Sequence, residues 1–134
     1  MIAIDTNVLL RYVVDTGDED QVAQARALVA RECSPIAPAL VVDIVLCEFV
    51  WVMRKTLRFK KADVVTALES LAIDSLIEFQ DRENVLSALQ SYAEGEADLA
   101  DHLIAVNALK SGAAEIVTFD AAASKHSPFR LIGL

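Results

Sequence analysis

The sequence contains few of the residues that mark several common protein classes. Only two of its 134 residues are cysteines, Cys33 and Cys47, and they lack the C-x-x-C spacing of metal and redox sites. Two such thiols predict neither a disulfide framework nor a zinc site. No signal-peptide pattern is visible either. We therefore expect a reduced, cytoplasmic protein whose cysteines are inert and buried.

Positive charge is also scarce. The chain has 12 lysines and arginines against 20 aspartates and glutamates, so its formal net charge is -8. Because phosphate contacts usually come from a basic surface, this balance argues against a generic nucleic-acid binder. One segment of the chain is nevertheless rich in basic residues. The simplest interpretation of this segment is a solvated helix end, and the alternative is a local contact with RNA. This segment contains Arg54, Lys55, Arg58, Lys60 and Lys61.

A long hydrophobic run free of acids is missing as well. Residues 36–53, IAPALVVDIVLCEFVWVM, approach the length of a membrane span but include Pro38, Asp43 and Glu48. An acid at the centre of a bilayer costs about 2.5 to 3.5 kcal/mol, so we expect this stretch to enter a soluble core and predict no membrane association. The hydrophobic content of 54% is ample for such a core, and the length fits a single domain over residues 1–134.

What the sequence does contain is an alternation of short β-branched runs with longer helical patterns. This alternation is typical of an α/β domain in which helices connect mainly parallel strands. We expect strands at residues 1–4, 35–37, 76–79, 115–119 and 129–132. We expect helices at residues 7–14, 18–32, 39–57, 61–73, 82–93 and 97–110, the last two followed by Gly95 and Gly112.

Two helical acids have apolar neighbours. At about 100° per residue, Glu48 shares a face with apolar residues such as Trp51, whereas Asp43 lies on a solvated edge. An ionised carboxylate in an apolar surround needs a cation or hydrogen-bond donors. Asp101 likewise projects away from the polar edge of its helix, one turn from Asp98. The alternatives are a Glu48 that reaches solvent at the helix margin and an Asp98 that interacts with the helix dipole.

Two further acids end strands. Asp5 follows MIAI and Asp120 follows EIVTF. If both strands run parallel in one sheet, both carboxylates emerge at its carboxyl edge, where the ligand sites of open α/β sheets collect. Each aspartate can instead cap the helix that follows it, a common role worth about 1 kcal/mol. A pair of such acids, with Glu48 and Asp101 on helices, favours one shared site.

Four converging carboxylates need a counter-charge, because each raises the pKa of the others. Oxygen-only ligands suit a hard cation, so one or two Mg²⁺ or Mn²⁺ ions are the expected cofactor. Two ions about 3.5 to 4 Å apart activate a water and stabilise the leaving oxygen in phosphodiester hydrolysis. The acids therefore predict a metal-dependent nuclease, and two divalent ions would offset their negative charge.

The order and spacing of these acids resemble those of a known family. DTNVLLRY at residues 5–12, Glu48 within VLCEFVWVMR, ADLADHLIA at residues 97–105 and TFD at residues 118–120 look like a PIN domain, and within that family like a VapC-type toxin. The match extends over nearly the whole chain. The resemblance implies a three-layer sandwich, with a central, mainly parallel sheet flanked by helices, and a Mg²⁺- or Mn²⁺-dependent endoribonuclease.

Carried over residue by residue, the resemblance also implies a site and a set of partners. The implied catalytic and metal-binding acids are Asp5, Glu48, Asp101 and Asp120. The implied accessory residues are Asp98, Thr6, Asn7 and Thr118, and for the last three, turn and cap hydrogen bonds are the alternative role. The implied partners are an RNA substrate such as transfer or ribosomal RNA, a cognate antitoxin protein and a second copy of the chain.

The chain departs from the family pattern after TFD. Similar proteins often carry a basic and an aromatic residue there, whereas this chain reads AAASKH. Lys125 and His126 are the candidate substitutes for substrate contacts from this loop.

Two other functions stay open. An aspartate-dependent phosphotransferase would use Asp5 as its nucleophile, but it needs a second acid two residues later, where this chain has Asn7. A non-catalytic PIN-like module for protein interaction or RNA binding would keep the fold, but mutually destabilising acids are unexpected there. His102 and His126 are surface or boundary histidines in this reading, and we expect neither to act as general acid or base.

Overall fold

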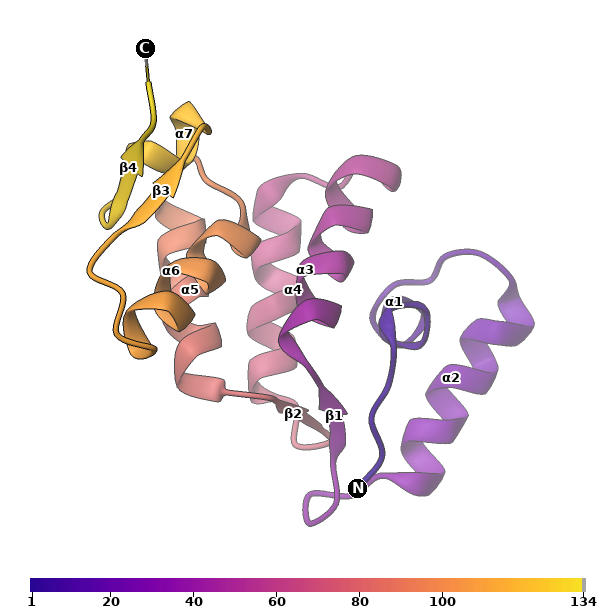
Figure 1. Ribbon diagram of the computed structural model, residues 1–134. Helices are drawn as coiled ribbons and strands as arrows, with labels where there is room; N and C mark the ends of the chain where they lie inside the picture. The colour runs from indigo at the N-terminus through magenta and orange to yellow at the C-terminus, as the bar shows by residue number, and fades with distance from the viewer. Residues whose placement is uncertain (134) are drawn as a thin grey trace. The chain divides into compact units, whose positions relative to one another are not determined.

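The computed structural model describes residues 1–133 and shows a mixed α/β protein (Figure 1). The chain divides into two compact units, one from Met1 to Arg82 and one that begins at Glu83. Each unit contains a pair of parallel strands, which confirms the predicted class of helices with parallel strands. Over residues 1–133 these pairs are separate hydrogen-bonded sheets. The single central sheet, the three-layer sandwich and the single domain therefore stay predictions.

The first unit alternates helices with short strands. Its elements are α1 (Thr6–Val13), α2 (Glu19–Glu32), β1 (Ala39–Val41), α3 (Asp43–Trp51), the π-helix η1 (Val52–Thr56), α4 (Lys61–Ile73) and β2 (Ile77–Phe79). The amino-terminal segment runs beside β1, where the Ile4 N–H donates to the Leu40 carbonyl oxygen over 3.0 Å and Ala3 pairs with Leu40 in parallel. The expected first strand is therefore a short parallel bridge that leads directly to Asp5.

Apolar side chains of several helices form the core of the first unit. Leu46 and Phe49 of α3 are fully shielded from solvent, as are Leu9 of α1, Val29 of α2 and Leu68 of α4. Leu46 and Phe49 are three residues apart and therefore share a helix face. Full burial of an apolar side chain of this size contributes about 1.5 to 3 kcal/mol, so the core stabilises the helix that carries Glu48.

The stretch before α3 differs from the prediction. The sequence predicts one helix over residues 39–57, but residues 39–41 form β1 and the helix begins at Asp43. The strand expected at residues 35–37 is also wrong, because Ser34 and Ala37 close a turn through reciprocal backbone hydrogen bonds of 3.1 Å. A continuous apolar run fits a buried strand and a buried helix equally well, so its periodicity does not place this boundary.

The apolar stretch at residues 36–53 is not one continuous helix. It contains the end of a turn, then β1, and then α3 with Asp43 in its first turn. Among the helices formed by residues 1–133, none combines the length and the apolar character needed to cross a bilayer.

A hydrogen bond between Tyr12 and Asp74 connects α1 to the end of α4. The Tyr12 hydroxyl donates to Asp74 Oδ2 over 2.5 Å, and Asp74 Oδ1 accepts the Leu76 N–H over 2.9 Å. Both side chains are half-buried. Burial raises the pKa of Tyr12 from 10.0 to about 12, and the hydrogen bond to Asp74 adds to the shift. The hydroxyl therefore keeps its proton, and with it the hydrogen bond, throughout the neutral range.

Replacing Tyr12 with phenylalanine is expected to lower the free energy of unfolding by about 1 to 2 kcal/mol, because Asp74 loses a charge-assisted hydrogen bond. The loss is measured by urea unfolding. Because the folded-state pKa is raised, the stabilisation is complete below pH 10 and disappears as the pH passes about 12. The two proteins should therefore differ in stability at pH 8 and converge toward about pH 12. A constant difference over this range would show that the hydroxyl proton is not responsible.

The second unit contains two long helices followed by a small sheet. Its elements are α5 (Arg82–Glu94), which starts at the boundary, α6 (Leu99–Lys110), β3 (Ile116–Thr118), α7 (Ala121–Ser124) and β4 (Phe129–Leu131). A polar cluster joins α5 to α6: the buried Asn84 donates to Asn107 Oδ1 over 3.0 Å and accepts from Lys110 Nζ over 3.1 Å. α7 was not expected from the sequence, since it is a single turn after Asp120.

The segment after α5 packs closely on His126. A side chain at Gly95 would overlap the His126 ring, so this position requires glycine. His126 Nε2 accepts the Glu96 N–H over 3.2 Å, and the His102 ring lies edge-on to His126 with ring centroids 5.2 Å apart. The expectation of a surface or boundary His102 is wrong, because this side chain is only 5% exposed. Both histidines therefore have packing roles within the second unit.

Candidate metal centre

Asp5 caps the first helix and keeps one carboxylate oxygen for another partner. It is exposed at the N-cap of α1, where Oδ1 accepts the Val8 N–H over 3.0 Å. No hydrogen bond reaches Oδ2 from any of residues 1–133. The capping role considered from the sequence is therefore real. Because the cap uses one oxygen only, it is compatible with cation binding through the other.

Glu48 is connected to the residue after Asp5. Thr6 Oγ1 donates to Glu48 Oε1 over 3.1 Å, so the start of α1 orients a carboxylate on α3. Glu48 is exposed, and its apolar neighbours Ile44 and Trp51 are 69% and 60% exposed. The apolar surround expected for Glu48 is therefore divided, because Ile44 and Trp51 lie on the outer surface whereas Val45 is buried. Glu48 reaches solvent, as the alternative interpretation held.

Cys47 lies near two acids but is not a nucleophile. Burial raises the pKa of its thiol, and the charges of Asp43 and Glu48 raise it further. The thiol therefore stays protonated at neutral pH, as expected for an inert cysteine. Cys33 is buried as predicted, but Cys47 is half-buried, so the prediction of two buried cysteines is wrong for Cys47. Asp43 was expected on a solvated edge but is half-buried in the first turn of α3.

Asp101 is a candidate acid in a partly buried setting near two other carboxylates. It is half-buried in the first turn of α6, where its Oδ2 accepts the Asp98 N–H over 3.2 Å within a capping box. Burial raises the pKa of Asp101, and the charges of Asp98 and Asp120 raise it further, against the opposing effects of the Asp98 N–H and His102. These acids of the second unit repel one another, and a cation would relieve the repulsion.

Asp120 repeats the arrangement of Asp5. It is the exposed N-cap of α7, and its Oδ1 accepts the Ala122 and Ala123 N–H groups over 2.8 and 3.2 Å. Within the described part of the chain, Oδ2 of Asp120 accepts no hydrogen bond. Thr118 Oγ1 accepts the Asp120 N–H over 3.0 Å, which is the turn-forming role considered for this threonine.

Three other candidate site residues, Asn7, Lys125 and His126, either form local contacts or form no side-chain hydrogen bond within residues 1–133. The Asn7 side chain is exposed and forms no hydrogen bond within residues 1–133, so it does not brace the turn after Asp5. Lys125 Nζ forms an ion pair with Glu96 Oε2 over 2.7 Å, and His126 accepts from the Glu96 backbone. The two substitutes proposed for substrate contacts from this loop are therefore both engaged by Glu96.

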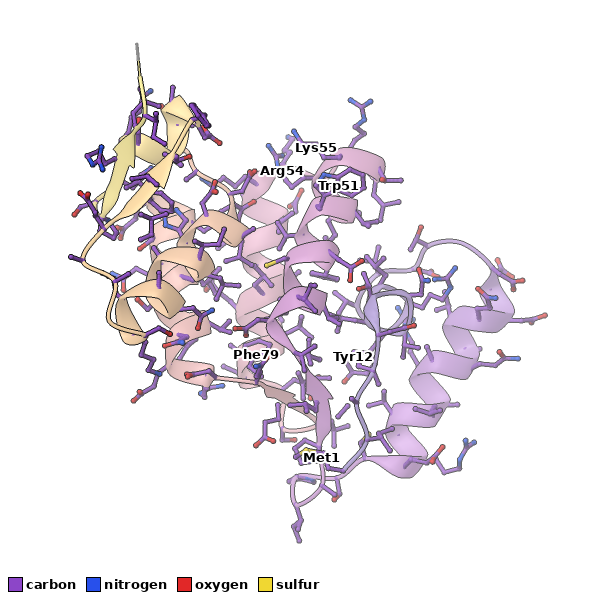
Figure 2. The ribbon with its side chains drawn as sticks, in the orientation of Figure 1. Met1, Tyr12, Trp51, Arg54, Lys55 and Phe79 are labelled. Carbon is purple, nitrogen blue, oxygen red and sulfur yellow. The ribbon has the colours of Figure 1, made fainter. Side chains whose placement is uncertain are left out.

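The basic segment after α3 is exposed. Figure 2 shows Trp51, Arg54 and Lys55 at the same end of the helix, where α3 continues into η1. Arg54 donates to the Phe59 carbonyl oxygen over 2.9 Å, and Arg58 has a φ of 62° that turns the chain back. The segment is thus a solvated helix end, as its simplest interpretation predicts. An exposed aromatic ring beside cations is also suited to stacking with nucleic-acid bases.

The candidate acids form two sets, each within one unit. Asp5 and Glu48 are connected through Thr6 in the first unit, whereas Asp98, Asp101 and Asp120 interact in the second. Among residues 1–133, no three His, Cys, Asp or Glu side chains are grouped as a metal site. The donors of both sets are oxygens, which fits Mg²⁺ or Mn²⁺ and not zinc. Metal binding by these residues stays a prediction.

A comparison with known families confirms the family resemblance noted in the sequence. The PIN domain profile matches residues 2–127, which is nearly the whole chain. The chain belongs to the PIN-domain family. Membership implies a Rossmann-like α/β fold, and PIN domains are typically nucleases that generally use divalent metals.

A VapC ribonuclease from Aquifex aeolicus (strain VF5) is a distant relative of this PIN domain. The two proteins are 24% identical over 119 residues, which cover 89% of this chain and 87% of the relative. No solved structure matches the chain significantly.

Proposed function

We propose that this PIN domain is a Mg²⁺- or Mn²⁺-dependent endoribonuclease that acts as the toxin of a toxin–antitoxin pair. The observation that carries the proposal is the environment of Asp101. Burial and two neighbouring carboxylates raise the pKa of Asp101, so its ionised form is unfavourable unless a cation balances the charge. A fold that retains such a carboxylate is well suited to metal binding, and nuclease activity is typical of the family.

The proposed ligands of one or two ions are Asp5, Glu48, Asp101 and Asp120, which are also the proposed catalytic acids. A bound metal supplies an activated water for attack on the RNA phosphodiester and stabilises the leaving oxygen. Hydrogen bonds from Thr6 and from the Asp98 N–H orient two of these carboxylates before any metal binds. Asp98 itself is proposed as an accessory acid, and Thr118 orients the turn that presents Asp120.

The proposed partners follow from the VapC relative and from family membership. They are an RNA substrate, such as transfer or ribosomal RNA, a cognate antitoxin protein and a second copy of the chain in the cytoplasm. Exposed apolar side chains offer surface for the two protein partners, since Ile36, Ile73 and Phe119 are 96%, 83% and 81% exposed.

A cleavage assay tests the proposal. Purified protein free of any partner is incubated with transfer RNA, ribosomal RNA and single-stranded DNA, in Mg²⁺, in Mn²⁺ and in EDTA. Cleavage of RNA is expected with either metal and not with EDTA. Glu48→Gln is expected to lose this cleavage, whereas Glu69→Gln, at an exposed position of α4, should retain it. RNA cleavage that survives both EDTA and Glu48→Gln would contradict a metal-dependent mechanism.

A non-catalytic PIN-like module for protein or RNA binding is the second candidate. Asp5 and Asp120 each cap a helix, so both have a structural role that needs no metal. Under this alternative, no RNA would be cut in any arm of the assay, while a partner would still bind. The phosphotransferase alternative has no support here, because the residue two positions after Asp5 is Asn7.

A further inference from the structure

A cavity of about 480 Å³ opens between α1 and α2 in the first unit, next to Asp5. The two helices lie side by side and the loop that joins them passes over one end (Figure 1). The lining of the cavity includes Asp5, Val8 and Arg11 at the start of the chain and Gln21, Gln24 and Leu28 on α2. Its size falls in the range of about 300 to 1,000 Å³ that is usual for small-molecule sites.

Arg11 supplies positive charge to this cavity. Its Nη1 donates to the Asn7 carbonyl oxygen over 3.2 Å, but its Nε is shielded from solvent and has no hydrogen-bond partner among residues 1–133. The loop holds the guanidinium closely, since a Cβ at Gly17 would lie 3.3 Å from Nη2. Gly17 has a φ of 78°, which other residues rarely adopt, so the loop is built to pass over this side chain.

An anionic group is the ligand that this guanidinium best accommodates. Arg11 forms no ion pair within the described part of the chain, so no acidic side chain there balances its charge. A phosphate group in the cavity would balance the charge of the guanidinium, whose planar set of donors matches phosphate geometry. Arg11 therefore provides an anion site in the same cavity as an acid that we propose to bind metal.

The rest of the lining fits a nucleoside. Gln21 and Gln24 on α2 are exposed amides, each with a donor and an acceptor, which is the combination that recognises base edges. Val8, Ala25 and Leu28 provide apolar surface for a sugar or a base. We propose that this cavity binds a nucleotide that flanks the cleaved phosphodiester, with its phosphate on Arg11 and its base against Gln21 and Gln24.

This inference rests on the proposed function, and the first experiment avoids any need for cleavage. The full chain in EDTA is titrated with inorganic phosphate, with the four nucleoside 5′-monophosphates, with the matching nucleosides and with a short acidic peptide, and binding is followed by NMR chemical-shift changes. We expect the monophosphates to bind more tightly than phosphate, nucleoside or peptide. Arg11→Gln should weaken monophosphate binding at least about tenfold, the loss of one charge-assisted hydrogen bond.

Matched variants separate charge from shape. Arg31→Gln removes an exposed arginine of α2 that pairs with Glu32, and it should leave monophosphate binding unchanged. Gln24→Ala should change the preference among the four bases but not the affinity for phosphate. If Arg11→Gln does not fold, as judged by circular dichroism, Arg11→Lys keeps the charge, loses the guanidinium fork and should still weaken binding. Equal affinities of wild type and the folded Arg11 variant, or tighter binding of the acidic peptide, would overturn the inference.

RNA cleavage in Mg²⁺ then distinguishes failure of the inference from failure of the proposed function. A wild-type protein that cuts RNA, together with an Arg11 variant of unchanged KM, would refute the nucleotide cavity and leave the nuclease intact. A wild-type protein that binds monophosphates through Arg11 but cuts no RNA would refute the nuclease and support the cavity.

Discussion

Replacing Asp101 with asparagine is expected to reduce RNA cleavage by about a thousandfold or more and, at the same time, to stabilise the metal-free protein. The loss of activity follows because metal-ion catalysis is worth several kcal/mol and each 1.36 kcal/mol is a factor of ten in rate. Asparagine keeps the shape and the oxygen that accepts the Asp98 N–H. The variant therefore removes the charge of Asp101 while preserving its hydrogen bond.

The gain in stability follows from the raised pKa of Asp101. A carboxyl whose pKa is higher in the folded than in the unfolded protein stabilises the fold at acidic pH, and this contribution is lost as the pH rises through the folded-state pKa. At neutral pH the ionised Asp101 is therefore unfavourable without metal, and asparagine removes that cost. Thermal melts in EDTA at pH 7 should give a higher Tm for Asp101→Asn than for the wild type.

The same melts with added Mg²⁺ or Mn²⁺ should reverse the order. Metal that binds only the folded protein stabilises it and therefore raises its Tm. The gain in the free energy of unfolding is about 2.7 kcal/mol when the metal concentration is a hundred times Kd. Asp101→Asn should lose most of this increase. Asp63→Asn, an exposed acid in the first turn of α4, should respond to metal like the wild type. A wild-type Tm that does not respond to either metal, or an Asp101→Asn variant that cuts RNA at the wild-type rate, would contradict the metal-binding role.

Replacing Phe49 with alanine is expected to lower the free energy of unfolding by about 3 to 5 kcal/mol, since it leaves a cavity in the core of the first unit. Phe49 has no exposed surface and lies on the face of α3 that also buries Leu46. Total stabilities of single domains are about 5 to 15 kcal/mol, so this one change removes a large share. Urea unfolding at constant temperature measures the loss.

Phe49→Leu serves as the matched control, because it keeps most of the apolar volume and should cost less than Phe49→Ala. Ile44→Ala on the exposed face of the same helix should have an effect within about 0.5 kcal/mol. An equal loss of stability for Ile44→Ala and Phe49→Ala would mean that α3 packs through a different face. The packing of Phe49 holds in place the helix that also carries Glu48, a proposed metal ligand. The Phe49→Ala variant should therefore also lose affinity for metal.

Much of the fold follows from local patterns in the sequence. The helix over residues 61–73 is observed as predicted, and its buried residues Val64, Leu68 and Leu71 recur at helical spacing. The helix over 82–93 ends at the glycine that the sequence indicates, although the reason for that glycine is the His126 ring packed against it. The boundary near residue 39 is wrong because an apolar run lacks the periodicity that separates strand from helix.

The sequence identified most of the candidate site residues but not all of their structural roles. Asp5 and Asp120 were identified from their positions after strands, and both are helix caps as the alternative interpretation proposed. The environment of Asp101 agrees best with the prediction from the sequence. The two carboxylates whose charges act on it, Asp98 and Asp120, were both named as candidate site residues. Arg11 was missed. Its sequence context, one turn after Asn7 in an apolar helix, gives no sign that the guanidinium lines a cavity.

The sequence by itself determined the identity and order of the acids and the alternation of helices with parallel strands. These depend on residue type and short-range spacing, which the chain carries without folding. Only the tertiary structure decided that Thr6 holds Glu48, that His102 is buried and that Arg11 faces α2 across a cavity. Each of these results from packing between elements distant in sequence, because burial and the partners of a polar group depend on which surfaces meet.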